Sequence, residues 1–163
     1  MSKVYGTKSD FAYVKQDASR TIIGYGLKEV DETHCTWYEI YFYKKQVSTP
    51  TLEQIKSAIF QDINETVRTK IIEDFEWHGH KVWLSTENQQ DYQNAFVVAV
   101  QTNGVNLPIM FKFGTDDDPD YYAFNEVTAL KEFWIDCSKY IEDTLQDGRK
   151  EKDEIDWSKY ENM

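Results

Sequence analysis

The sequence predicts an α+β fold. Its first 48 residues hold two runs of β-branched and aromatic residues, which favour strands. Three later segments repeat apolar residues at steps of three and four, the spacing of one helix face, and shorter apolar runs lie between them. We therefore expect an N-terminal antiparallel β-hairpin or sheet, followed by helix, β-hairpin, helix, β-hairpin and a long C-terminal helix with a docked tail.

The N-terminal segment contains two expected strands, Thr21–Leu27 and Cys35–Tyr43, joined by a turn at Asp31–Thr33. The second strand is aromatic on both faces, so we expect helices or a partner to cover each face. Gly24 and Gly26 stand at alternate positions of the first strand and lack the third glycine of a phosphate-binding loop. They are more typical of a bulge or of close packing.

A polar connector follows, and it divides the chain into a β segment (1–48) and an α+β domain (49–163). Whether the two share one continuous core stays open. Thr51 and Gln54 form a capping-box pattern, which predicts a helix that begins there. Its predicted apolar stripe is Leu52, Ile55, Ile59, Ile63 and Val67.

Two short strands, Ile71–Trp77 and Lys81–Leu84, are expected next, joined through His78-Gly79-His80. Thr86 and Gln89 repeat the capping-box pattern and predict a second helix that ends at Asn103-Gly104. We expect its inward face to be Tyr92, Phe96, Ala99 and Val100.

Alternating apolar residues from Leu107 to Phe113 predict a half-buried strand, and Tyr121–Phe124 a returning one. The last helix is expected from about Glu126 to Gln146, stopped by Asp147-Gly148. The tail carries three apolar residues that should dock it, although we expect truncation of Asp153–Met163 to leave the fold intact. The predicted inward face of the last helix is Val127, Leu130, Trp134, Cys137, Ile141 and Leu145, and the tail anchors are Ile155, Trp157 and Tyr160.

The net charge disfavours two classes of partner. The net charge is −11 and the pI is about 4.7, a field that disfavours direct binding to nucleic acid or to anionic membranes. Residues 114–163 hold 15 acidic and 6 basic side chains. A solvated acidic helix face, a surface for a basic protein and a mimic of DNA charge all stay open.

Catalytic and metal-binding patterns are weak throughout. Glu76, His78 and His80 would share one face of a straight strand, but Gly79 is expected to turn the chain between them. Asp116, Asp118 and Asp120 alternate like a calcium loop without its glycine or its final glutamate, which favours a solvated turn. We expect no metal, no cofactor and no enzymatic activity; a hydrolase whose carboxylates come together only in space stays an alternative.

The two cysteines, Cys35 and Cys137, are far apart in the sequence and are expected to be reduced. No apolar run is long enough to cross a membrane, and the N-terminus lacks the apolar segment of a secretory signal. We therefore expect a cytoplasmic protein.

Several segments together resemble a domain of unknown function encoded by tailed phages and prophages, including those of gut Bacteroides-type bacteria. The best-matching part runs from about Phe75 to Tyr160, and the pairing of Val82-Trp83-Leu84-Ser85 with the Asp156-Trp157 tail is its most specific feature. The segments that carry the resemblance are Tyr25–Val30, Thr36–Lys45, Val82–Gln89, Leu107–Gly114 and Glu151–Trp157 with Tyr160.

The resemblance implies a setting among tail and tail-fibre genes and brings no catalytic residues. We expect a protein-binding module that acts as a tail accessory or a fibre-assembly factor, in the host cytoplasm or in the virion. Its partner would be a tail or fibre protein, and homo-oligomer formation stays open. An acidic DNA mimic that inhibits a host nuclease or DNA-binding protein is the alternative. The predicted binding residues are Trp37, Tyr41, Tyr43, Trp83, Trp157 and Tyr160.

Overall fold

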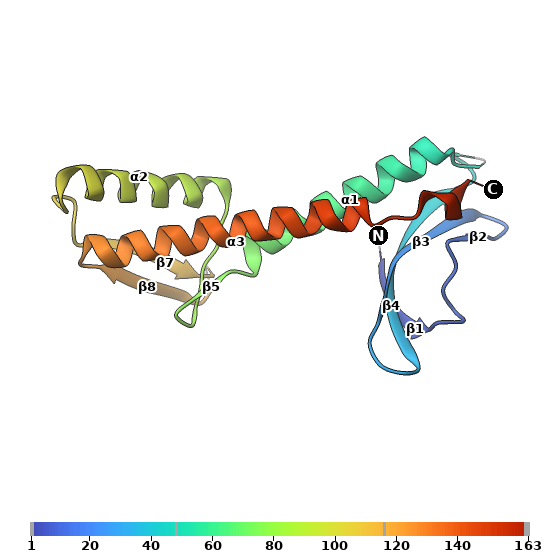
Figure 1. The fold of residues 1–163 in the computed structure, drawn as a ribbon, viewed down its shortest axis with the longest axis horizontal. Helices are drawn as coiled ribbons and strands as arrows, with labels where there is room; N and C mark the ends of the chain where they lie inside the picture. The colour runs from blue at the N-terminus through green and yellow to red at the C-terminus, as the bar shows by residue number, and fades with distance from the viewer. Residues whose placement is uncertain (1, 48, 116, 162–163) are drawn as a thin grey trace. The chain divides into compact units, whose positions relative to one another are not determined.

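A computed structural model of the chain describes residues 2–47, 49–115 and 117–161 and has the predicted α+β fold (Figure 1). The chain forms two compact units. Unit 1 consists of the residues up to Glu65 together with those from Gly148 onward, and unit 2 is Thr66–Asp147. The elements are β1 (Ser2–Thr7), β2 (Val14–Gln16), β3 (Arg20–Glu29), β4 (His34–Tyr43), α1 (Leu52–Glu73), β5 (Glu76–Trp77), β6 (His80–Lys81), α2 (Thr86–Thr102), β7 (Ile109–Gly114), β8 (Pro119–Phe124), α3 (Val127–Asp153) and the 3₁₀ turn η1 (Trp157–Tyr160).

The polar connector between residues 44 and 50 lies inside unit 1, and α1 and α3 each contribute to both units. The compact units are therefore not delimited at residue 48. Whether residues 1–48 and 49–163 behave as separate domains in folding stays a prediction.

Unit 1 is built on an antiparallel sheet with strand order β1-β4-β3-β2. The predicted pair of β3 and β4 is confirmed, while β1 and β2 were not predicted. β2 has three residues, and β1 reads Ser-Lys-Val-Tyr-Gly-Thr with most side chains exposed, so neither carries a strong apolar signal. Their pairing depends on the long inner strands.

The glycines of β3 mark both a bulge and a close approach, as predicted. The register between β3 and β4 shifts between Tyr25 and Lys28, and Gly26 within this bulge has a φ of 65°. A Cβ at Gly24 would lie 2.3 Å from the Ala12 carbonyl oxygen. A larger residue at Gly24 would therefore push the preceding loop away from the sheet.

Helix α1 begins with the predicted capping box. The Thr51 backbone N–H donates to Gln54 Oε1 at 2.9 Å, and the Gln54 N–H donates to Thr51 Oγ1 at 3.3 Å. The prediction of a strand at Ile71–Trp77 is wrong, because α1 continues to Glu73. Ile71 extends the four-residue step of the stripe from Val67, and this helical spacing outweighs the β propensity of Ile71 and Ile72. Only Glu76–Trp77 pairs with His80–Lys81, across a His78-Gly79 turn in which both residues have positive φ.

Helix α2 is capped one residue earlier than predicted. Ser85 Oγ accepts the Asn88 N–H, while the Gln89 side chain donates to the Leu84 carbonyl instead of completing a box at Thr86. Asn103, in the left-handed conformation, ends the helix. The buried residues are Tyr92, Ala95 and Ala99, so the prediction that Val100 faces inward is wrong.

Helix α3 passes through Asp147-Gly148, where the sequence predicted a stop. Glycine in a helix costs only about 1 kcal/mol relative to alanine, and Gly148 is buried where packing offsets that cost. Leu130 and Cys137 are buried as expected, but Leu145 is exposed and the fully buried Phe133 was not predicted.

The core of unit 2 is a cluster of aromatic rings around Phe133. Phe133 contacts the ring of Trp77 on β5 and that of Tyr92 on α2, each at a centroid distance of 5.1 Å. It also lies 5.5 Å from Phe113 on β7 and 5.1 Å from Phe124 on β8. One side chain of α3 therefore packs against both hairpins and against α2.

The C-terminal tail docks on unit 1, as predicted. Tyr160 is 2% exposed, and its hydroxyl donates to the Gly24 carbonyl at 2.9 Å. Trp157 packs edge-on against Phe60 of α1, at a centroid distance of 5.6 Å. The expectation that truncation of Asp153–Met163 leaves the fold intact is therefore reversed, because it would remove a buried ring from the core of unit 1.

Substitution of Tyr160 should destabilise unit 1. We expect Tyr160→Ala to cost about 3–5 kcal/mol, because it leaves a cavity the size of an aromatic ring. Tyr160→Phe keeps the ring and loses only the bond to Gly24, so it should cost about 1–3 kcal/mol. Urea unfolding with hydrogen exchange of the β3 amides measures both. Unchanged β3 protection in Tyr160→Ala would show that the tail is not part of the core.

Candidate functional site

The predicted binding residues do not form one site. Trp83 belongs to unit 2, and the other five belong to unit 1. Trp37 and Tyr160 are each 2% exposed and are packing residues in this structure. Tyr41 and Trp157 are half-buried, whereas Tyr43 and Trp83 present their rings to solvent.

The aromatic strand β4 lies inside its sheet. It pairs with β1 from His34 to Glu39 on one side and with β3 along most of its length on the other. Tyr41 is held internally: its hydroxyl donates to Glu39 at 2.8 Å, and the Arg20 guanidinium lies 4.7 Å from its ring centroid. Strand addition to β4 is therefore blocked over its paired length.

Trp83 is presented by an anchored backbone segment. Its neighbours Val82 and Leu84 are fully buried, so the alternation of an extended chain turns Trp83 outward. The Val82 N–H donates to the Phe75 carbonyl at 2.9 Å, and the Leu84 N–H to the Ile72 carbonyl at 3.0 Å. The Trp83 carbonyl accepts the Asn88 side-chain amide at 2.8 Å. The indole therefore projects from a fixed position.

A shallow depression of about 440 Å³ lies beside this indole. Its lining combines the apolar ring with the amide of Asn88, the hydroxyl of Thr115 and the ammonium of Lys112. Such a mixture suits recognition, because the ring contributes contact area and the polar groups fix orientation. The lining residues are Trp83, Asn88, Lys112, Gly114 and Thr115.

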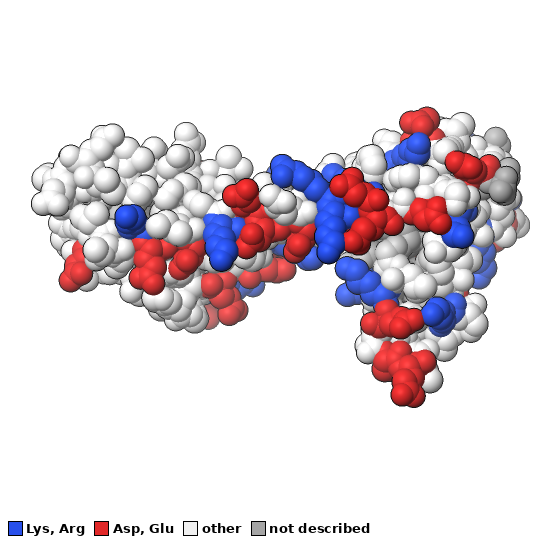
Figure 2. Space-filling view, in the orientation of Figure 1, with Lys and Arg blue, Asp and Glu red and all other residues white. Residues whose placement is uncertain are grey.

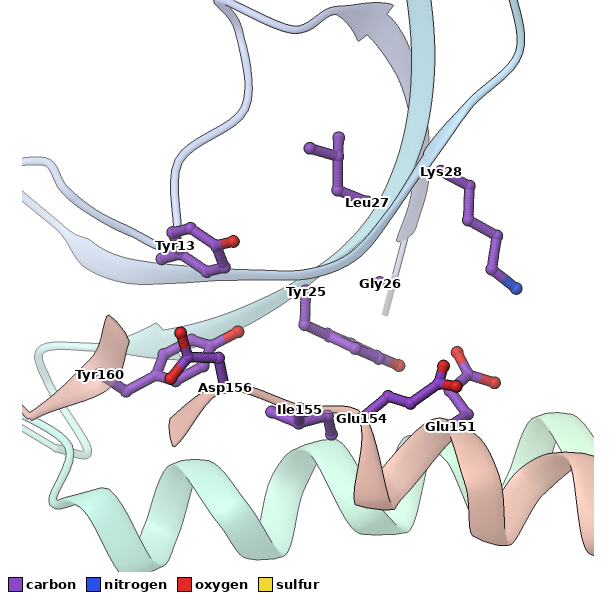
Figure 3. A pocket seen from close by; sticks show the side chains of 10 residues that line it. All are labelled: Tyr13, Tyr25, Gly26, Leu27, Lys28, Glu151, Glu154, Ile155, Asp156 and Tyr160. Carbon is purple, nitrogen blue, oxygen red and sulfur yellow. The ribbon is translucent and has the colours of Figure 1, made fainter. Parts of the chain in front are cut away.

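A second pocket, in unit 1, combines tyrosine rings with carboxylates. Its volume is about 330 Å³, and its lining includes the rings and carboxylates drawn in Figure 3. Two of the carboxylates make local contacts: Glu154 lies 3.8 Å from Lys150 Nζ, and Asp156 accepts the Ser158 N–H and hydroxyl. The aromatic and acidic lining residues are Tyr13, Tyr25, Tyr160, Glu151, Glu154 and Asp156.

Tyr25 of this pocket also donates its hydroxyl to Asp62, a buried carboxyl on α1. Burial raises the pKa of Asp62, and the negative charge of Glu151 acts in the same direction. In contrast, hydrogen bonds from Ser158 lower the pKa of Asp156. Asp62 is not among the residues that line the pocket. Its bond to Tyr25 joins α1 to β3 within unit 1.

The histidines that the sequence offered as candidate metal ligands each contact a different neighbouring residue. His78 stacks on Trp77 at a centroid distance of 4.0 Å, while His80 Nδ1 bonds to Asp120. Asp116 lies outside the described residues. Among the residues that are described, no three His, Cys, Asp or Glu side chains are grouped to hold a metal ion.

Both cysteines are buried and unpaired, and burial raises the pKa of the Cys137 thiol to about 12. A thiol so far from ionisation at neutral pH is a poor nucleophile. Cys137 therefore behaves as a small core side chain, as predicted.

Acidic and basic side chains are intermixed on the surface, as Figure 2 shows. Lys8 bonds to Glu29 at 2.7 Å, and Lys159 lies 3.7 Å from Asp156. A mimic of the DNA backbone needs a regular run of negative charge, which these pairs interrupt.

No family model matches the chain, and no curated protein and no solved structure matches it either. The phage-family resemblance therefore stays a prediction from the sequence. None of the helices within the described ranges has the length and apolar character needed to cross a membrane.

The raised pKa of Asp62 predicts a pH-dependent effect of Asp62→Asn. Below the ordinary value of 3.8 the carboxyl is protonated in both folded and unfolded chains. As the pH rises above 3.8, the unfolded chain ionises first, so ionisation favours unfolding. The unfolding free energy of Asp62→Asn relative to the wild type should therefore rise with pH and then level off.

Urea unfolding of both proteins at a series of pH values measures this difference. Asp143→Asn, which alters an exposed carboxyl on α3, is the control for the loss of one negative charge. A difference between Asp62→Asn and wild type that stays constant with pH would contradict the prediction.

Proposed function

We propose that this chain is a non-enzymatic protein-binding module and that the depression beside Trp83 is its main contact site. The observation that best supports this proposal is the exposure of Trp83 to solvent. It is 41% exposed, whereas Trp37 and Trp77 are buried and the remaining two tryptophans, Trp134 and Trp157, are half-buried. Tryptophan is among the residues that most often dominate binding energy at interfaces.

The fixed backbone around Trp83 supports this proposal. Association loses free energy whenever a mobile side chain or loop must be ordered. Here Val82 and Leu84 are already packed and hydrogen-bonded, so a partner that covers the indole orders little else. An apolar partner side chain could fill the depression while its backbone pairs with the polar groups of Asn88 and Thr115.

The biological setting is proposed from the sequence resemblance alone. It is that of a phage or prophage tail accessory, or of a factor that assembles a tail fibre, in the bacterial host or in the virion. The acidic residues of α3 and the tail would act at longer range, because complementary charge raises association rates and selects partners more than it adds affinity.

Capture of partners from cells with an induced phage or prophage tests the proposal. Tagged wild-type protein should retain a tail or fibre protein through a high-salt wash, because an apolar contact is not screened by salt. Trp83→Ala should weaken retention by about 30-fold or more, the loss typical of an interface hot spot. Trp83→Phe should lose less, since it keeps a ring.

Tyr5→Ala removes an exposed ring in unit 1 and is the control for loss of surface aromatic area. Equal retention by wild type and Trp83→Ala, with both folded, would exclude the Trp83 site. Recovery of host DNA-handling proteins alone, lost on the high-salt wash, would support the acidic DNA mimic instead.

A further inference from the structure

A surface of unit 2 carries little charge in a chain that is otherwise densely charged. No Asp, Glu, Lys or Arg occurs from Tyr92 to Phe111, whereas these residues make up 29% of the sequence. Figure 2 shows the surface over α2 as white, with red and blue side chains along α3 below it. The exposed residues that define this neutral face are a subset of those in the uncharged stretch: Gln93, Asn94, Val97, Val98, Gln101, Val105 and Met110.

The neutral face is continuous because the loop after α2 folds back onto the helix. The Asn106 side-chain amide donates to the Ala95 carbonyl at 3.1 Å, and the Val105 N–H donates to Thr102 Oγ1 at 3.2 Å. Between this loop, α2 and β7 lies a shallow depression of about 440 Å³, whose lining includes Val98, Met110 and one charged residue, Asp91. Apolar side chains thus make up most of the lining of a hollow on a helix–strand surface, beside the amides of Asn94 and Asn106 and the carboxylate of Asp91.

Valine is an unusual choice for exposed helix positions. It loses side-chain freedom in a helix, and long polar residues or alanine are favoured where no packing decides. Val97 and Val98 nevertheless stand adjacent on the solvent side of α2. Their presence is explained if they are packed in the working form of the protein.

We propose that the neutral face is a self-association surface, on which the α2 helices of two copies of this chain pack together. Electrostatics favours this face over the rest of the surface. Each copy carries −11, so contact through charged faces would bring like charges together. Contact through the neutral face brings mostly uncharged side chains together, since Asp91 is the only charged residue among those that line its hollow.

The composition of the face also suits a second copy. Across a two-fold axis each residue meets the same surface patch on its partner, so the patch must be complementary to itself. Valine packs against valine, and the amides of Gln93, Asn94 and Gln101 each offer a donor and an acceptor. A patch of acidic residues would fail this requirement.

Sedimentation equilibrium over a series of protein concentrations tests the proposal. The wild-type mass should rise from that of one chain toward that of two, and added salt should strengthen association by screening the net charge of each copy. Val98→Glu should raise the dimer dissociation constant about a hundredfold, because it adds a second carboxylate beside Asp91 in a largely apolar hollow and brings like charges together across the axis. Val98→Ala should weaken association less, and since alanine favours helix, circular dichroism should show an intact fold.

Val30→Glu is the matched control. Val30 is an exposed valine of unit 1, at 56% against 43% for Val98, and the substitution adds the same charge. It should associate like the wild type. A wild type of single-chain mass at every concentration would overturn the proposal, as would equal effects of the two glutamate variants. This test needs no other protein, so its outcome is independent of the Trp83 site.

Discussion

The structure of unit 2 depends on the packing of one side chain, Phe133 of α3. The elements around it cannot stand alone: β5 and β6 have two residues each, and an isolated two-stranded hairpin is at best marginally stable in water. Phe133 packs against rings from β5, α2, β7 and β8, and each aromatic pair contributes about 0.5–1.5 kcal/mol beyond the burial of its area. The small elements are stable because they share this ring.

The same packing explains why an exposed indole can be held in place. Trp77 contacts Phe133, and its Nε1–H donates to Asp136 on α3 at 3.1 Å. This contact fixes the β5–β6 hairpin, which leads directly into the extended segment from Val82 to Leu84. The orientation of Trp83 therefore follows from the aromatic core. The proposed binding site depends on that core and on the orientation of Trp83.

Much of the fold could be predicted from the sequence, because helical stripes, alternating strands and turn glycines are local signals. The predictions from the sequence were wrong at positions whose structure is decided by contacts with residues far away in the chain. Phe133 and Trp134 are adjacent aromatic residues, and only the rings from four other elements make Phe133 the buried one. Gly148 reads as a stop, yet packing carries α3 through it. The candidate site was harder still to predict. Trp37, Trp83 and Tyr160 are all aromatic residues in the sequence, and only tertiary burial separates the packing residues from the exposed one.

Site-specific photo-crosslinking measures the binding role of position 83 most directly. A photoreactive phenylalanine derivative would replace Trp83, or Tyr5 as a reference, in a host whose phage or prophage is induced. We predict a crosslink from position 83, absent from position 5, to a tail or fibre protein identified by mass. Crosslinks that are the same from both positions, or no crosslink from position 83 in a folded protein, would contradict a partner site at Trp83.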